Sequence, residues 1–326
     1  MKKRIIALVL AAIMLLSVAA CAPAIDTEKE ISVMVLNGTT GFGMAKLMDD
    51  AANGTAALNY KFSVETDATA INGALINGTV NIAALPTNAA AAVYNKSQGK
   101  VQVVALNTLG VLYLVEKGDT VKSFDDLKGK TIYVPGKASN PEYVTAYLCD
   151  KFGLEVGKDV TLDFTYNAPA ELRTAVAAGK VDLAVLPEPM VTIAKAANPD
   201  LRVALDFTEQ WDKVSTPGSL VQGCIVTTKE FAESNAAELD KFLEEYEASV
   251  KFATDDAAAA GELIAKHGIF EKAPIAAKAL PNCNITFVKG EQMKTALENF
   301  YGVLYNANSK AVGGKLPAED HYYIGK

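Results

Sequence analysis

The sequence predicts an α/β fold of two lobes, each a mixed sheet flanked by helices, joined by two crossovers of the chain. One observation is an internal repeat, because residues 74–86 and 175–187, which lie 101 positions apart, are identical at six of thirteen aligned positions. Another is size, since 50% of the residues are hydrophobic and a mature chain of about 300 residues usually divides into two units. A third is the order of elements, because the C-terminal part of the chain returns to the first lobe.

Each copy of the repeat combines the same local signals. An apolar helix ends at Gly78 or Gly179, a short aliphatic run follows as a buried strand, and Pro86 or Pro187 ends that strand. Another helix begins directly after each Pro, which suits a first turn because Pro has no N–H to leave unpaired. Each copy therefore places a helix N-terminus at the carboxyl end of a strand, where open α/β sheets bind ligands. Two lobes with a cleft between them follow; the alternative is two ordinary units of one larger sheet.

The N-terminus carries an export signal. Basic residues at 2–4 precede an unbroken apolar run at 5–16, which is too short to span a membrane and typical of a secretory leader. The small residues before Cys21 resemble a bacterial lipobox. We therefore expect a signal peptide at 1–20, a diacylglycerol on Cys21, and a tether at 21–30 that holds the protein at the extracytoplasmic face of the cell membrane. The alternative is an ordinary signal peptide cut close to the same place.

The charge balance excludes one class of partner. The full chain has a net charge of −7, and loss of residues 1–20, which hold three basic residues, leaves 28 basic against 38 acidic residues and a net charge of −10. An acidic exported domain lacks the basic surface that nucleic-acid binding requires. We therefore expect no nucleic-acid partner.

The cysteine and histidine positions argue against a metal centre. One of the four cysteines is assigned to the lipid, which leaves Cys149, Cys224 and Cys283, and the two histidines are His267 and His321. Because no spacing among them resembles a zinc site, we predict no metal. Export permits a disulfide between Cys224 and Cys283, and three free buried thiols are the alternative.

The first lobe is predicted to begin at 31–116. An apolar strand at 31–36 is followed by the loop Asn-Gly-Thr-Thr-Gly and a helix that ends near residue 52, which is the first half of a βαβ unit. The loop lacks the Gly-Lys-Ser/Thr of a nucleotide P-loop, but it offers backbone N–H groups and hydroxyls to an anion or a carbonyl. Further strands are expected at 60–64, 101–106 and 111–115.

The second lobe is predicted to span 117–217 and to repeat the plan of the first. Ser123 caps a short turn before a strand at 131–134, and a Gly-containing loop at 135–141 leads into a helix that stops at Gly153. A strand at 160–165, a helix at 188–197 and a strand at 202–205 are expected after it.

The C-terminal third is predicted to return to the first lobe. Residues 220–227 are apolar and β-branched, as expected of a strand that crosses back. Helices are expected at 229–253, 257–266, 274–280 and 291–306, with an extended segment at 285–288. The first lobe is thus discontinuous, 31–116 plus 218–326, and the two crossovers form a hinge that lets the cleft close on a ligand.

Two groups of residues resemble a known family. Ser-Phe-Asp-Asp-Leu-Lys-Gly-Lys-Thr-Ile-Tyr-Val at 123–134 resembles the segment that opens the second lobe of type II periplasmic binding proteins. Gly-Thr-Val-Asn-Ile-Ala-Ala-Leu-Pro and Gly-Lys-Val-Asp-Leu-Ala-Val-Leu-Pro-Glu-Pro resemble the branch that binds nitrate, sulfonates, taurine or thiamine precursors for ABC importers. The resemblance covers nearly all of the mature chain. It implies a monomeric solute-binding lipoprotein that captures a small organic solute between the lobes and delivers it to an ABC permease and its ATPase, without a cofactor and without catalysis.

The resemblance also implies where the ligand binds, on the loops that follow the strands of both lobes. The candidate ligand-binding residues are Asn37, Thr39, Thr40, Thr66, Thr69, Thr87, Asn88, Lys137, Ser139, Asn140 and Glu188. For each of them the alternative is a helix cap or a turn, because short polar residues at helix starts usually cap.

The charged residues leave two ligand classes open. The mature chain has two arginines, and we expect Arg173 in mid-helix and Arg202 at a strand start to lie away from the cleft, which disfavours a bidentate clamp on a multiply charged ligand. Lys137 and the helix N-termini can hold a weak anion such as a sulfonate. Glu188 instead suits an amine or an amino-pyrimidine, so a thiamine-precursor-like heterocycle is the other class.

Two other roles use the same scaffold. A lipid-anchored sensor that feeds a receptor has the same sequence features as an importer component. An enzyme of pyrimidine-precursor synthesis for thiamine would resemble this fold, but the chain lacks a cysteine cluster and a histidine-bearing catalytic constellation. Export also fits poorly with cytosolic biosynthesis.

Overall fold

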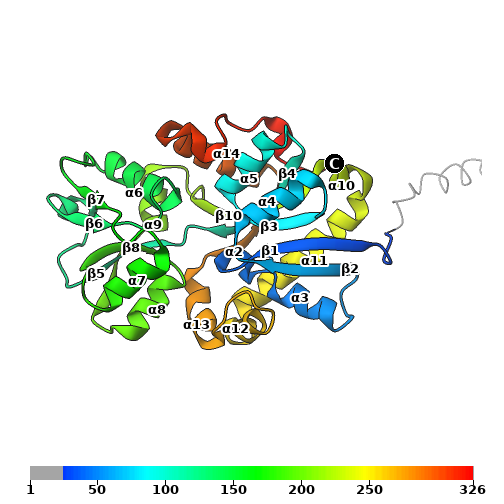
Figure 1. The fold of residues 1–326 in the computed structure, drawn as a ribbon, viewed down its shortest axis with the longest axis horizontal. Coiled ribbons are helices and arrows are strands. Elements are labelled where there is room, and N and C mark those ends of the chain that lie inside the picture. The colour runs from blue at the N-terminus through cyan, green and yellow to red at the C-terminus, as the bar shows by residue number, and fades with distance from the viewer. Residues whose placement is uncertain (1–24, 326) are drawn as a thin grey trace, which may run out of the picture.

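The computed structural model describes residues 25–325 and contains two separate mixed sheets flanked by helices (Figure 1). The six-stranded sheet has the order β11-β4-β10-β3-β1-β2, and the five-stranded sheet has the order β7-β6-β8-β5-β9. We call the six-stranded sheet with its helices the first lobe and the five-stranded sheet with its helices the second lobe. The predicted two-lobed α/β class is confirmed; the predicted signal peptide and the lipidation of Cys21 lie outside the described residues.

In the first lobe the order of strands follows from one βαβ unit and a returning strand. Its strands are β1 (Glu30–Leu36), β2 (Asn59–Glu65), β3 (Ile82–Pro86), β4 (Val101–Leu109), β10 (Val221–Thr228) and β11 (Ile285–Val288). β1 pairs in parallel with β2 and β3, whereas β10 runs antiparallel between β3 and β4. The strand that was predicted to cross back to the first lobe is therefore β10.

The second lobe repeats this plan with shorter strands. Its strands are β5 (Leu112–Lys117), β6 (Thr131–Tyr133), β7 (Thr161–Asp163), β8 (Leu183–Pro187) and β9 (Leu201–Asp206). β6 is parallel to β7 and β8, and β5 is antiparallel to β8 and β9. The two copies of the repeat take equivalent positions in their sheets. β3 lies between the parallel strand β1 and the antiparallel strand β10, and β8 lies between the parallel strand β6 and the antiparallel strand β5. Both antiparallel strands adjoin a crossover.

The helices cover both faces of each sheet. The helices of the first lobe are α2 (Thr39–Phe42), α3 (Ala45–Ala52), α4 (Ala68–Asn77), α5 (Thr87–Lys96), α10 (Lys229–Ser234), α11 (Ala236–Asp255), α12 (Ala257–Lys266), α13 (Ala273–Ala279) and α14 (Gly290–Ala307). Those of the second lobe are α6 (Asn140–Lys151), α7 (Pro169–Ala177), α8 (Met190–Ala197) and α9 (Phe207–Val214). The 3₁₀ turns are η1 (Phe124–Leu127), η2 (Leu280–Asn282), η3 (Ser309–Val312) and η4 (Glu319–His321). None of the described helices is both long and apolar enough to cross a membrane.

The chain passes between the sheets at Gly110 and again through 215–220. The first passage lies before the expected boundary at 116/117, because all of β5 belongs to the five-stranded sheet. Gly110 has a packing reason to be Gly, since a Cβ there would overlap the Thr208 hydroxyl. The Asn284 side chain donates a hydrogen bond to the Gly110 carbonyl over 2.6 Å, which fixes the passage against the first lobe.

One apolar core is continuous from lobe to lobe. It joins one face of each sheet to α4, α5 and α14 of the first lobe and to α6 and α9 of the second. Trp211 on α9 is fully buried and meets Phe300 on α14 edge-on, with ring centroids 5.8 Å apart. The opposite face of the first sheet packs on α3 and α10 to α13, and that of the second sheet on α7 and α8. The lobes are therefore fused along α6, α9 and α14.

The alternative of three free, buried thiols holds, and the expected disulfide between Cys224 and Cys283 is wrong. Cys224 lies in the core that α5 and α14 cover, whereas Cys283 lies in the core under α11 to α13. Burial raises the pKa of the third thiol, Cys149, to about 12, so it stays protonated and unreactive.

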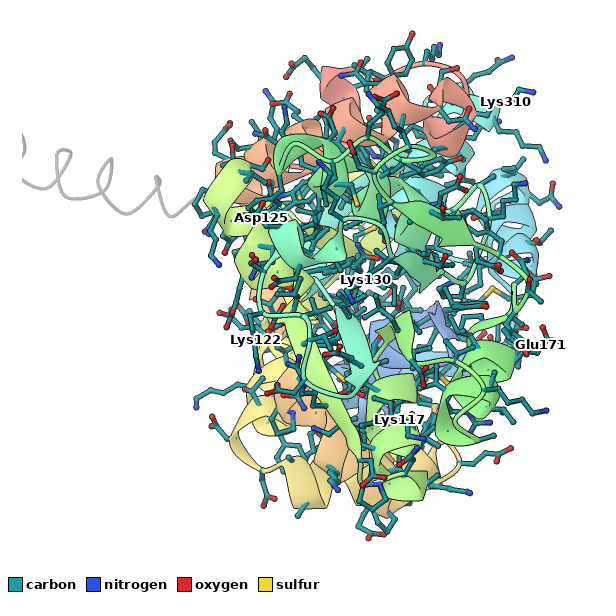
Figure 2. All side chains as sticks on the ribbon, turned by 90° about the vertical axis from the view of Figure 1, so that its left-hand side faces the viewer. Lys117, Lys122, Asp125, Lys130, Glu171 and Lys310 are labelled. Carbon is teal, nitrogen blue, oxygen red and sulfur yellow. The ribbon has the colours of Figure 1, made fainter. Side chains whose placement is uncertain are left out.

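The free end of the second lobe is strongly charged but carries both signs. Figure 2 views this end, where Lys122 and Asp125 extend into solvent near the 3₁₀ turn η1. Lys122 forms an ion pair with Asp119. Such exposed pairs contribute little to stability.

Candidate functional site

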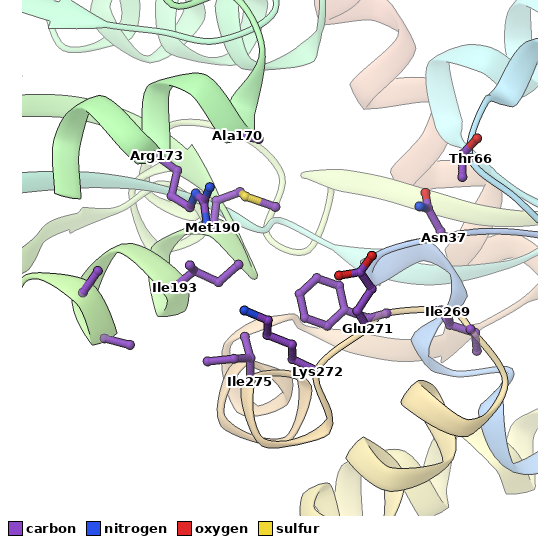
Figure 3. Close-up of a pocket in the computed structure, with 14 residues that line it drawn as sticks. Asn37, Thr66, Ala170, Arg173, Met190, Ile193, Ile269, Glu271, Lys272 and Ile275 are labelled. Atoms are coloured by element: carbon purple, nitrogen blue, oxygen red, sulfur yellow. The ribbon is translucent and has the colours of Figure 1, made fainter. Parts of the chain in front are cut away.

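A cavity of about 690 Å³ lies between the lobes, on the side opposite to the fused core, and is partly open to solvent (Figure 3). That volume is in the range that proteins use for small-molecule ligands. Its lining residues are Asn37, Thr66, Ala170, Arg173, Met190, Ile193, Ala196, Ala197, Gly268, Ile269, Phe270, Glu271, Lys272 and Ile275. The first lobe supplies residues from strand ends and from the segment before α13, and the second lobe supplies α7 and α8.

The first-lobe wall is held by the segment between α12 and α13. Ile269 is 1% exposed, and its carbonyl accepts a hydrogen bond from Gly38 N over 3.0 Å, which joins this segment to the loop after β1. Gly41 lets the two pieces approach, because a Cβ there would lie 2.8 Å from the Ile269 side chain. Phe270 lies edge-on to Phe42, with ring centroids 6.2 Å apart. Glu271 and Lys272 follow directly and are thus presented from a fixed base.

The second-lobe wall is formed by the first turns of α7 and one face of α8. Met190 and Ile193 are one helical turn apart on α8 and give this wall its apolar surface. Arg173 comes from α7, one turn after the helix begins at Pro169. A long side chain on a helix points back toward the N-terminus, which here is the end that faces the cavity. The expectation that Arg173 lies away from the cleft is therefore wrong.

The charges in this cavity have no ionic partners of their own. Within residues 25–325, no carboxylate lies within ion-pair distance of Arg173 or Lys272, and no basic group lies within that distance of Glu271. The Arg173 guanidinium donates to Thr174 Oγ1 over 3.0 Å, while its Nε is buried without a partner. Arg202 differs, because it is paired with Glu116 inside the second lobe. The arrangement can hold an anion beside an apolar surface.

Glu188 faces a different cavity. It is 4% exposed, and its carboxylate accepts hydrogen bonds from Thr192 N and Thr192 Oγ1, each over 3.0 Å. Burial raises the pKa of Glu188, and the Thr192 bonds oppose that rise. The cavity that it lines measures about 510 Å³, lies on the other face of α8, and includes Tyr113 and Asn282. The structure therefore separates Glu188 from Arg173 and Lys272.

Two of the residues predicted to bind the ligand use their hydroxyls for hydrogen bonds to backbone carbonyls instead. Thr87 is fully buried, and its hydroxyl donates to the Val221 carbonyl over 2.8 Å. The Ser139 hydroxyl donates to the Gly136 carbonyl, and Ser139 is the N-cap residue of α6. Both side chains thus fix the loops at the strand ends.

The remaining predicted residues are distributed over the loops at the two strand edges. Asn37 and Thr66 line the interlobe cavity. Thr39, Thr40, Thr69, Asn88, Lys137 and Asn140 are not among its lining residues. Asp67, beside Thr66, caps α4 by accepting from Thr69 N over 2.8 Å. Lys137 is exposed and lies over the Phe164 ring at 5.7 Å.

No cluster of three or more potential metal-ligating side chains occurs in the part of the chain that the structure describes. Sequence reasoning missed the residues at 268–272, since they follow a predicted helix rather than a strand and their contact with the loop after β1 is long-range. Arg173 had a usable signal, because it lies one turn after Pro169, which marks a helix start.

Comparison with known proteins gives a consistent result. A family model described as ABC transporter, phosphonate, periplasmic substrate-binding protein matches residues 44–273. The crystal structure of an ABC transporter from Parabacteroides distasonis superposes with a TM-score of 0.78 at 26% identity, covering 92% of this chain and 100% of that one. A comparison with curated proteins finds no match.

More distant solved structures share the fold. The periplasmic aliphatic sulphonate binding protein SsuA from Escherichia coli has a TM-score of 0.71 at 17% identity, covering 90% of this chain and 92% of its own. The periplasmic nitrate-binding protein NrtA from Synechocystis has a TM-score of 0.58 at 11% identity, covering 87% and 84%. At these identities the likeness establishes the arrangement of the two lobes and leaves the ligand open.

Proposed function

The chain belongs to the family of periplasmic substrate-binding proteins of ABC transporters whose model it matches over residues 44–273, and we propose that its substrate is a small organic anion bound in the interlobe cavity. It is the extracytoplasmic substrate-binding component of an ABC import system and works with an ABC permease. The observation that carries the choice of ligand is the unpaired Arg173 guanidinium beside the apolar face of α8. A guanidinium without a carboxylate partner favours a ligand that supplies the negative charge.

The apolar part of the cavity argues for a ligand with an organic body. Met190, Ile193 and Ile275 line the same cavity as Arg173. A small inorganic ion would leave this surface and most of the 690 Å³ in contact with water. A sulfonate, a phosphonate or a carboxylate that carries an alkyl or aryl group fills both parts of the site.

The amine alternative has weaker support. It relied on Glu188, whose carboxylate is engaged with Thr192 and lies in the second cavity. The acid that does line the interlobe cavity is Glu271, and two cations, Arg173 and Lys272, accompany it there. We therefore rank an organic anion above a thiamine-precursor-like heterocycle.

We further propose that the protein binds its solute without chemical change, acts as a monomer, and is anchored through a lipid on Cys21. The solved relatives described above are binding proteins, which supports the first point. The apolar run before Cys21 supports the third. Replacing Cys21 by Ser should move the protein from the membrane fraction to the soluble fraction; retention on the membrane would contradict the anchor.

A ligand panel tests the proposed function. The full-length protein, unfolded and refolded in detergent to remove bound solute, is heated with alkyl and aryl sulfonates, alkyl phosphonates, taurine, nitrate, thiamine and its pyrimidine precursors, riboflavin or amino acids. A ligand at about 100 times its Kd stabilises the folded state by roughly 2.7 kcal/mol, which raises Tm by several degrees. Stabilisation by organic anions supports the proposal, whereas stabilisation by the pyrimidines alone contradicts it. Recovery of the ligand unchanged tests the absence of catalysis.

A further inference from the structure

Arg173 and Lys272 reach the same cavity from opposite lobes (Figure 3). Arg173 belongs to α7, whose neighbours Leu172 and Val176 are buried in the second-lobe core. Lys272 directly precedes α13, and Ile269 buries the same segment in the first-lobe core. Each cation is thus attached to a rigid part of its own lobe, so a movement that closes the cleft must bring the two positive charges together.

The surroundings neutralise this pair only in part. Lys266, six residues before Lys272, shows the usual situation, because it pairs with Asp49 over 2.5 Å. Glu271 is the single acid among the residues that line the cavity, and it belongs to the same lobe as Lys272. The lining therefore carries one excess positive charge, and like charges that come within the screening length of about 8 Å at physiological ionic strength repel one another.

We propose that Arg173 and Lys272 form a cross-cleft cation pair that binds the acid group of the ligand from both lobes and that, without an anion, keeps the lobes apart. This inference rests on the proposed function and adds how the site is regulated. A ligand can favour closure only through contacts that differ between the open and closed forms. An anion between Arg173 and Lys272 does so, because it replaces repulsion by two attractions only when the lobes are close. A solute of the same shape without the charge fits the apolar wall and leaves the repulsion in place.

Charge reversal tests the pair without any ligand. Arg173→Glu and Lys272→Glu each create an opposite-charge pair across the cleft, and the double variant Arg173→Glu/Lys272→Glu restores like charges. Small-angle X-ray scattering of the full-length ligand-free protein in detergent, with the detergent contrast-matched, gives the radius of gyration. We expect each single variant to be more compact than the wild type in low salt and to lose that shift at high salt. The double variant leaves acids on both sides of the cleft, with Glu271 among them, so we expect it to be no more compact than the wild type.

Lys310→Glu is the matched control, since it makes the same charge change at an exposed position on η3 that does not line the cavity (Figure 2). It should leave the radius of gyration unchanged. Three results would overturn the proposal: single variants that match the wild type, a double variant as compact as the single ones, or a compact Lys310→Glu. Circular dichroism confirms that each variant is folded.

Ligand binding supplies the second measurement. With hexanesulfonate as the probe, Arg173→Gln and Lys272→Gln should each weaken binding about tenfold or more, and 1-hexanol should bind neither variant nor the wild type measurably. Equal affinity of wild type and both variants for hexanesulfonate would remove the pair from the site. If no panel compound binds, the proposed ligand class fails while the ligand-free scattering result still decides on the cation pair.

Discussion

The two sides of the lobe interface are built in opposite ways. Along α6, α9 and α14 a single apolar core runs from one sheet to the other, and Trp211 packs between Tyr147 and Phe300. Along α7, α8 and α13 the interface contains a 690 Å³ cavity with three unpaired charges, those of Arg173, Glu271 and Lys272. A dry, close-packed interface resists separation, whereas a hydrated and charged one separates at little cost. We therefore predict that the first side is the fixed back of the hinge and the second is its mouth.

The largest effect should come from breaking the fixed side. Trp211→Ala removes the largest fully buried side chain, which also donates a hydrogen bond from Nε1 to Ser219 Oγ over 2.8 Å. We expect the free energy of unfolding to fall by about 3–5 kcal/mol, measured by urea denaturation followed by circular dichroism. Tyr305→Ala, at an exposed position on α14, is the control and should change it by less than about 0.5 kcal/mol. A small loss in Trp211→Ala would mean that the lobes are not fused through this core.

The second effect concerns charge on the fixed side. His321 is fully buried between Tyr94 and Tyr301, and burial lowers its pKa to about 4. The folded state therefore binds a proton less readily than the unfolded state, so the stability that neutral His321 provides is complete above pH 6.5 and is lost as the pH falls from 6.5 to 4. The loss should reach about 3 kcal/mol.

Urea denaturation between pH 7 and pH 4 measures this slope, and His321→Gln should flatten it. The comparison of the two proteins at each pH cancels the contribution of the carboxylates. An equal slope in both proteins would show that His321 is protonated within the fold and that the α14 side tolerates charge.

The sequence predicted the scaffold better than the site, and particular residues show why. The repeat that ends at Pro86 and Pro187 depends on local signals, a helix stop, a buried strand and a helix start, and it led to the correct placement of β3 and β8. The passage at Gly110 is set by a contact with Thr208, almost a hundred positions away, and was placed too late in the chain.

The cavity depends on long-range neighbours to an even greater degree. Lys272 reaches it because Gly41 allows Ile269 to pack against the loop after β1, and neither residue has a pattern that reveals the other. Thr87 and Glu188 occupy equivalent positions after the two copies of the repeat, yet their side chains bond differently. The Thr87 hydroxyl donates to the Val221 carbonyl, whereas the Glu188 carboxylate accepts from the Thr192 hydroxyl. Polar residues at helix starts are equally suited to capping and to ligand binding, so their type alone did not separate the two roles.

The third prediction separates structural from ligand-binding polar residues. Thr87→Val keeps the side-chain shape and removes the buried hydroxyl that donates to the Val221 carbonyl. We expect the unfolding free energy to fall by about 1–3 kcal/mol and the affinity for hexanesulfonate to stay unchanged. Asn37→Ala, whose side chain lines the cavity, is the counterpart and should weaken binding while leaving stability nearly unchanged. Denaturation and isothermal titration on both variants check this; weakened binding in Thr87→Val would return Thr87 to the site.

The smallest effect should come from single hydrogen bonds that join the lobes, one on each side. On the mouth side, burial raises the pKa of the Tyr113 phenol, so it stays a donor, and it bonds to the Asn282 carbonyl over 2.7 Å. On the fixed side, Asn308 Nδ2 donates to the Tyr143 hydroxyl over 2.9 Å. Each bond is worth about 0.5–1.5 kcal/mol.

Because a bond at the mouth must break when the lobes separate, Tyr113→Phe should act on the closure equilibrium and weaken apparent affinity about two- to tenfold. The bond between Asn308 and Tyr143 joins parts that stay together, so Tyr143→Phe, which removes it and keeps the Asn308 cap on Lys310 N, should lower the unfolding free energy and leave affinity unchanged. Titration and urea denaturation of both variants decide between the sides: the reverse assignment of the two effects would place the hinge along α8 and α13 and the opening along α14.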